Sequence, residues 1–146
     1  NEYNLAKIVE KIMLPYLYAN YELDEEEYID VLRDEKGYNL KSKAYIFVKP
    51  ILVSESEAIA EAIETAKHCE SIGVDRLSVC PATIHAGTVI ERFWRKGAYQ
   101  PPWIWSCIEI INTIRREVNI PALLDTSGFG SRRGPYNCKK CNKKQA

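Results

Sequence analysis

From residue 44 onward, apolar and polar positions first follow a strand pattern and then a helix pattern. Residues 44–48 (AYIFV) form an apolar, aromatic and β-branched run closed by Pro50, which predicts a buried strand. Ser54 and Glu57 then have the spacing of a capping box at the start of a helix. The apolar residues that follow recur at helical spacing as far as Gly73, so we predict a helix between Ser54 and that glycine.

The same order repeats further along the chain. Residues 76–80 (RLSVC) predict a second strand, and Thr88 with Glu91 predicts the start of a short helix. Residues 103–118 carry one apolar face at helical spacing, and residues 120–125 (IPALLD) predict a third strand. A strand, a helix and a strand in such close succession form a βαβ unit. We therefore expect parallel strands with right-handed crossovers.

The predicted fold class is α/β, built from parallel βαβ units. Three such strands cannot close a barrel, because a full barrel of this kind takes roughly 200 residues or more. The region is therefore either the second half of a partial, TIM-like barrel or a small open sheet. We divide the chain into a helical N-terminal segment (1–42), a half-barrel α/β region (43–130) and a basic tail (131–146).

One face of such a sheet is left without helices. We expect this open face to expose apolar side chains and so to invite a partner or a second copy. The side chains expected there are those of Tyr45, Phe47, Leu77 and Val79, or their neighbours.

Composition and charge argue against a disordered chain and against a membrane-spanning one. The 146 residues are 46% hydrophobic and 10% aromatic, which is typical of a folded domain and not of a disordered segment. The 20 basic and 20 acidic side chains cancel, but eight acidic residues lie between Glu22 and Glu35, and six basic ones lie from Ser131 onward. No apolar run approaches the ~18–20 residues that cross a bilayer, and no basic-then-apolar stretch predicts a secretory leader. We expect a cytoplasmic protein that makes no membrane contact.

The five cysteines are too few and too scattered for a secreted disulfide scaffold. Cys69, Cys80 and Cys107 lie in apolar-patterned segments and are interpreted as small hydrophobic residues. Cys138 and Cys141 instead form a C-x-x-C in the basic tail, at a spacing that can chelate one zinc or iron ion. Such a site takes four ligands, so two must come from elsewhere. The alternatives are a redox-active dithiol and a cysteine pair that has neither a metal nor a redox role.

Five phrases from Lys43 onward carry a family resemblance: KAYIFVKP, SESEAI, DRLSVCPATIHAGTVIERFW, YQPPWIWS and DTSGFGSRRGPYNCKKC. Together they resemble the C-terminal half of the archaeosine-biosynthesis radical S-adenosylmethionine (SAM) proteins. That group has relatives among the Elongator-like and MiaB-like radical SAM proteins. The resemblance covers Lys43 to Cys141, and we expect residues 1–42 to lie outside it.

The resemblance implies a [4Fe-4S] cluster on a C-x-x-x-C-x-x-C motif, whose free iron binds SAM and whose reduction generates a radical. This chain lacks that motif, and Cys69, Cys80 and Cys107 are too far apart to imitate it. In the family the motif belongs to the other half of the barrel. We therefore expect that an N-terminal half-barrel is needed, and that the chain alone neither holds the cluster nor cleaves SAM.

The resemblance also implies a substrate and a partner. The family acts with a tRNA-guanine transglycosylase-like archaeosine synthase subunit on the D-loop of archaeal tRNA, where a lysine-bearing 7-deazaguanine becomes archaeosine. This half would supply strands whose carboxyl ends line the cofactor and substrate cavity. Lys49, Ser78 and Asp125 are the candidate cofactor-binding residues, and His85, after the second strand, is a further candidate.

The basic tail is predicted to contact RNA. Arg132 and Arg133 offer bidentate donors to phosphate, Lys139 and Lys140 add point charges, and Tyr136 can stack on a base. The alternative is that the tail is a solvent-exposed chain end that makes no contact with RNA.

The three tryptophans, Trp94, Trp103 and Trp105, are interpreted as packing residues. For the whole chain, the rival to part of a radical SAM enzyme is a non-catalytic metal- or RNA-binding module.

Overall fold

The computed structural model describes residues 41–137 of the chain. Its elements run in the order β1 (Lys43–Val48), α3 (Glu55–Ser71), β2 (Arg76–Pro81), α4 (Val89–Arg95), α5 (Ile104–Glu117) and β3 (Ala122–Leu124). The strands form one parallel sheet in the order β1-β2-β3, so the predicted α/β class and strand direction are confirmed. The predicted N-terminal helical segment and the C-x-x-C lie outside the described residues, apart from Lys41 and Ser42.

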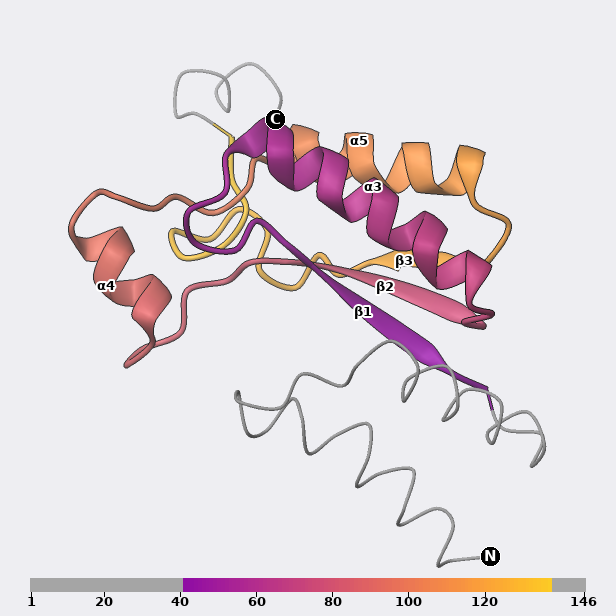
Figure 1. The fold of residues 1–146 in the computed structure, drawn as a ribbon. Coiled ribbons are helices and arrows are strands. Elements are labelled where there is room, and N and C mark those ends of the chain that lie inside the picture. The colour runs from indigo at the N-terminus through magenta and orange to yellow at the C-terminus, as the bar shows by residue number, and fades with distance from the viewer. Residues whose placement is uncertain (1–40, 138–146) are drawn as a thin grey trace, which may run out of the picture.

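α3 and α5 lie side by side on one face of the sheet (Figure 1). The small residues Ala58, Ala62 and Ala66 are buried on α3, so this helix can approach the strands closely. The core between the layers is completed by buried aliphatic residues of the strands and of α5: Ile46, Val48, Leu77, Val79, Ile110, Ile111 and Ile114. One continuous apolar core therefore fixes the sheet against its two long helices.

The capping box predicted at Ser54 is present. The Glu57 amide donates to Ser54 Oγ at 3.3 Å, and the Ser54 amide donates to Glu57 Oε2 at 2.8 Å. α5 begins differently, because Trp103 offers no side-chain cap and its own amide donates to Glu55 Oε1 at 2.7 Å. Glu55 on the first turn of α3 thus fixes where α5 starts.

The opposite face of the sheet carries exposed apolar side chains. Tyr45 is 59% exposed, Phe47 52% and Leu123 62%. The prediction of an open apolar face is therefore right for Tyr45 and Phe47. It is wrong for Leu77 and Val79, which pair in register with Ala44 and Ile46 and face the helices. Side chains alternate along a strand, so only one of the two sets can lie on the open face.

α4 and the loop that follows β3 both lie beyond the carboxyl ends of the strands (Figure 1). Since ligands of parallel sheets bind at that edge, these two segments define the neighbourhood in which a site is expected. Within residues 41–137, no helix has the length and apolarity needed to cross a membrane.

Candidate functional site

Lys49 directly follows β1, and its side chain forms an ion pair with Glu55. Its Nζ lies 2.5 Å from Glu55 Oε2, and its backbone carbonyl accepts a hydrogen bond from the Tyr99 hydroxyl at 2.7 Å. Burial alone would raise the pKa of Glu55, but the hydrogen bonds from Lys49, Trp103 and Ser106 outweigh it and hold that pKa below its ordinary value. Lys49 therefore ties the end of β1 to the first turn of α3.

Ser78 is on the open face of the sheet, where its register partners are Tyr45 and Leu123. It is only 7% exposed, and Cys80 Sγ lies 3.8 Å from its hydroxyl. Asp125 follows β3 at the carboxyl edge. Hydrogen bonds from Ser127, the backbone amide at 2.9 Å among them, and the charge of Lys43 keep the Asp125 pKa below its ordinary value. The structure thus leaves Ser78 on the open face and Asp125 ionised and exposed at its edge.

The described residues do not suit an iron–sulfur cluster or another metal centre. Cys69 lies in α3, Cys80 in β2 and Cys107 in α5, and all three are free thiols. Burial, together with the charge of Glu55, raises the pKa of Cys107 to about 12. Within residues 41–137 no group of three or more His, Cys, Asp or Glu residues could hold a metal ion. Cys138 and Cys141 lie outside the described residues.

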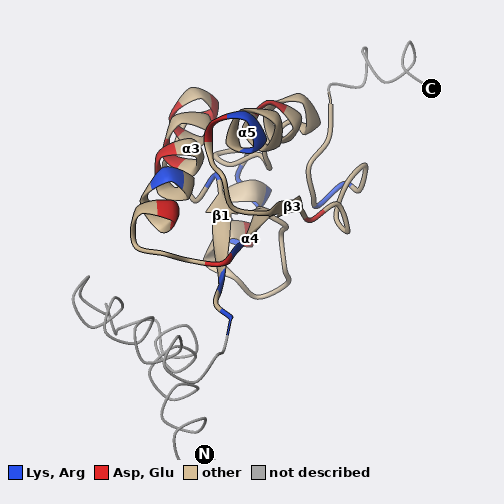
Figure 2. Ribbon diagram, turned by 90° about the vertical axis from the view of Figure 1, so that its right-hand side faces the viewer, with Lys and Arg blue, Asp and Glu red and all other residues tan. Residues whose placement is uncertain are grey.

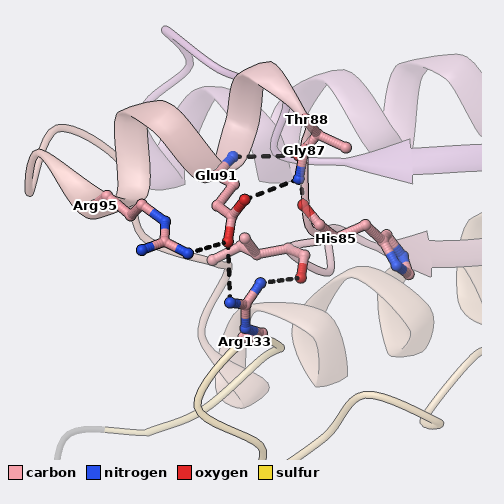
Figure 3. Close-up of polar contacts among 7 residues, drawn as sticks. His85, Gly87, Thr88, Glu91, Arg95 and Arg133 are labelled. Atoms are coloured by element: carbon pink, nitrogen blue, oxygen red, sulfur yellow. Dashed lines mark hydrogen bonds and ion pairs between the residues drawn. The ribbon is translucent and has the colours of Figure 1, made fainter.

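A carboxylate-centred cluster joins α4 to the loop after β3 (Figure 3). Glu91 Oε2 accepts the Gly87 amide at 2.8 Å, while Oε1 accepts from Arg95 Nη2 and from Arg133 Nη2, each at 2.9 Å. Arg133 also donates to the Ile84 carbonyl, and the Ile84 amide donates to the Arg133 carbonyl at 2.7 Å. The loop is therefore fixed to the segment between β2 and α4 through both backbone and side chain.

This cluster keeps Glu91 charged. The backbone N–H of Gly87, then the guanidinium groups of Arg95 and Arg133, lower the Glu91 pKa to about 2. The carboxylate is largely buried, so it acts as a fixed anion that orients two cations. Thr88 caps α4 as predicted, since its hydroxyl accepts the Glu91 amide.

Arg132 and Arg133 gather around one aromatic ring. Their guanidinium carbons lie 5.6 Å and 5.2 Å from the centroid of Trp94, within range of cation–π attraction. A surface pocket beside them is lined by Trp94, Arg95, Gly130, Ser131, Arg132, Arg133, Tyr136 and Asn137. The structure thus brings together three predicted RNA-contacting residues, Arg132, Arg133 and Tyr136. Lys139 and Lys140 lie outside the described residues.

Close backbone packing shapes the loop after β3. The Gly130 amide donates to the Pro135 carbonyl at 2.8 Å, and the Ser131 hydroxyl donates to the Gly128 carbonyl at 2.8 Å. A Cβ at Gly134 would overlap that same Gly128 carbonyl oxygen, so only glycine fits there. The loop lies apart from α3, which carries five glutamates (Figure 2). The basic pocket is thereby kept away from the acidic helix.

Sequence reasoning missed two members of this cluster. Trp94 does pack, as predicted, against the buried cluster of Ala82, Ile84 and Tyr99, but the sequence does not show that its ring also supports two arginines at a pocket. Glu91 was assigned only to the start of α4. The Thr88–Glu91 spacing was the available signal, because an acidic residue at that position can accept amides ahead of the helix. Of the other two tryptophans, Trp103 is 50% and Trp105 51% exposed, so neither is a core residue.

Comparison with known proteins finds similar chains in archaea. An uncharacterised protein of Methanocaldococcus jannaschii is 44% identical over 129 residues, which cover 85% of this chain and 35% of that protein. Archaeosine synthase subunit beta of Methanosarcina acetivorans is 33% identical over 122 residues, 83% of this chain and 35% of the relative. Archaeosine synthase subunit beta of Thermococcus kodakarensis is 39% identical over 99 residues, 67% of this chain and 30% of the relative. No family model matches.

The extent of these matches has two consequences. The chain spans only 30–35% of the length of these curated relatives. In addition, matches that cover 85% and 83% of the chain are longer than residues 43–146, so they extend into the first 42 residues. The expectation that residues 1–42 lie outside the resemblance is therefore wrong.

Proposed function

We propose that this chain is part of an archaeal enzyme that forms archaeosine in tRNA. The observation that carries the proposal is that relatives from two archaea share the name archaeosine synthase subunit beta and match most of the chain. A subunit of a synthase has a partner, and the family resemblance points to a tRNA-guanine transglycosylase-like chain. The proposed substrate is the 7-deazaguanine of the tRNA D-loop.

The finer proposal is that the reaction is of the radical SAM type. The phrases around PPWIWS and RRGPYNCKKC support it. Since the described residues do not suit a four-iron cluster, we assign that cluster to a part of the protein that this chain does not span. When bound, the cluster and SAM would supply the radical. By itself, this chain is expected to leave SAM uncleaved.

Under this proposal the open face of the sheet lines the cofactor and substrate cavity. Ser78 would offer a hydroxyl from the middle strand, and Asp125 an ionised carboxylate at the carboxyl edge. Tyr45 and Phe47 would form an apolar wall that excludes water. Lys49 would serve as a positioning residue, because its ammonium group pairs with Glu55.

The test of the proposal is the archaeosine content of tRNA. Deleting the gene in an archaeon that carries it should abolish archaeosine and accumulate the lysine-bearing precursor, as measured by mass spectrometry of tRNA nucleosides. Return of the wild-type gene, or of an Arg116→Gln variant altered on the exposed end of α5, should restore the modification. Normal archaeosine in the deletion strain would overturn the proposal and favour a non-catalytic module.

A second test concerns the tail. We propose that Cys138 and Cys141 hold a zinc or iron ion, and that Arg132, Arg133, Lys139 and Lys140 contact the tRNA backbone. Replacing both cysteines with serine should release metal, as measured by elemental analysis, and weaken tRNA binding. Replacing both arginines should weaken binding and flatten its salt dependence while the metal stays bound. Unchanged metal content and unchanged affinity in the double serine variant would contradict this assignment.

A further inference from the structure

A surface pocket lies between α4 and the loop after β3. Trp94 and Arg95 line it from α4, and Arg132 and Tyr136 from the loop. Two elements that are separated in the chain are held together here by the ion pair between Glu91 and Arg133. The walls are therefore fixed before any ligand arrives, which lowers the ordering entropy that binding would otherwise lose.

Charge at the pocket favours an anion. The Glu91 carboxylate is shared between Arg95 and Arg133, and Arg132 lines the same pocket, so three guanidinium groups lie near one carboxylate. Arg132 has no ion-pair partner among residues 41–137, and its residue is exposed. An unshared guanidinium group beside two others is suited to a phosphate, to which it can donate two parallel hydrogen bonds.

The aromatic part of the pocket favours a planar group next to that anion. The Arg132 guanidinium is held over the Trp94 ring, and Tyr136, which is partly buried, lines the same pocket. Both a guanidinium plane and an aromatic ring are surfaces on which unpaired bases stack. A lone phosphate or an acidic side chain would leave these planar surfaces unused.

Asn137 adds an unpaired polar atom to the pocket. It lines the same pocket and is only 8% exposed, yet its Oδ1 has no hydrogen-bond partner among residues 41–137. Buried acceptors are nearly always paired, so an unpaired one beside a pocket points to a donor from a ligand. The amino or imino N–H groups of a nucleobase edge are such donors.

We propose that this pocket binds one unpaired nucleotide of RNA, with its base stacked at Arg132 and Trp94, its phosphate near the arginines, and a base N–H donated to Asn137 Oδ1. The inference rests on the proposed function in taking tRNA as the RNA. It adds that recognition requires a nucleotide that has left its helix, because a paired base can neither stack there nor present its edge.

The test is the affinity for fluorescein-labelled single-stranded RNA pentamers and for tRNA, measured by fluorescence anisotropy on the intact protein. Arg132→Gln should weaken binding of both by a factor in the range of about 5 to 150, the usual loss for one stacked base. Arg132→Lys, which keeps the charge but loses the plane, should weaken it nearly as much. Arg116→Gln on α5 is the matched control and should bind within about twofold of wild type.

Asn137→Leu is a second, independent variant. It removes an unsatisfied buried acceptor and so should fold at least as stably as wild type, while losing affinity for the pentamers. Thermal melts of every variant check folding. The inference is overturned if the wild-type protein binds no RNA, if Arg132→Lys binds as wild type, or if Asn137→Leu keeps full affinity.

These results can be separated from those of the proposed function. Archaeosine lost on gene deletion, with full RNA affinity in all pocket variants, leaves the proposed function standing and overturns the pocket. Weakened RNA binding in the pocket variants, with normal archaeosine after deletion, supports the pocket and overturns the proposed function.

Discussion

At the scale of single residues, Glu91 controls how the loop after β3 is held. Its carboxylate accepts one backbone N–H and two guanidinium groups, and no other carboxylate among residues 41–137 forms ion pairs with two arginines. The arginines would otherwise be free to sample many rotamers. Glu91 therefore acts on the pocket indirectly, by placing Arg133 and the loop that also carries Arg132.

We predict that Glu91→Gln destabilises the protein in a pH-dependent way. The folded Glu91 pKa of about 2 lies below its ordinary value of 4.5. A carboxylate with a lowered pKa stabilises the fold fully above about pH 4.5, and this contribution is lost as the pH falls toward 2. The Tm difference between wild type and variant should thus be largest at neutral pH and vanish near pH 2. Calorimetry from pH 2 to pH 7 measures it.

The control for this experiment is Glu61→Gln, an exposed substitution on the solvent side of α3. It should change Tm little at any pH, because exposed charges contribute little to stability. A Glu91→Gln effect of constant size across the whole pH range would contradict an ionic role and indicate a purely steric one.

The hydrogen-bond partner of a side chain could be predicted from the sequence where the two residues are close in the chain. The Ser54–Glu57 capping box needs only local spacing, and it is present. The partner of Arg133, in contrast, is 42 positions away, so its pairing depends on how the whole sheet brings α4 and the loop together. The ion pair of Lys49 likewise could not be predicted, since Glu55 becomes its partner only once β1 and α3 pack.

At the scale of elements, the positions of strands and helices were predictable, and their faces were not. Apolar runs and caps mark β1, α3, β2 and α5 to within a few residues. β3 is shorter than the predicted 120–125, because Pro121 lacks an N–H for the ladder. At the other end, the Asp125 amide makes a last bond to the Val79 carbonyl, and the Asp125 carboxylate then accepts the Ser127 amide as the chain turns. The choice of the covered face is settled by the packing of α3 and α5 against the strands.

We predict that Gly134→Ala opens the loop after β3. The new Cβ would meet the Gly128 carbonyl oxygen, and relief of such an overlap destabilises the closed loop by about 1–3 kcal/mol. Trypsin cleavage after Arg132 and Arg133 should then accelerate roughly 5- to 150-fold, because proteolysis follows the population of the open form. Gel or mass-spectrometric time courses give the rates.

Gly130 offers the matched control. It has a φ of +73° but open space around its Cα, so the requirement there is conformational and not steric. Asparagine tolerates the left-handed region, so Gly130→Asn should leave the cleavage rate within a few-fold of wild type. Equal acceleration in the two variants would show that backbone conformation, and not the close approach at Gly134, holds the loop.

At the scale of the whole molecule, one face of the sheet is covered by helices and the other is open. The covered face buries its side chains under α3 and α5, whereas Tyr45, Phe47 and Leu123 remain more than half exposed on the open face. The chain spans only 30–35% of its curated relatives, so most of each relative has no counterpart in it. An apolar sheet face of this kind is a surface that a further part of the protein can cover.

Phe47 and its neighbour Val48 allow this idea to be tested in one strand. In the chain as given, Phe47→Ser should hardly lower the free energy of unfolding, because Phe47 is 52% exposed, whereas Val48→Ser should unfold the sheet, because Val48 is only 1% exposed. In a protein extended by the remaining length of the relatives, we expect Phe47 to be buried, and Phe47→Ser should then cost about 1–3 kcal/mol. Urea unfolding of both forms measures the difference. If Phe47→Ser is equally mild in the two forms, the open face stays uncovered and the half-barrel proposal is wrong.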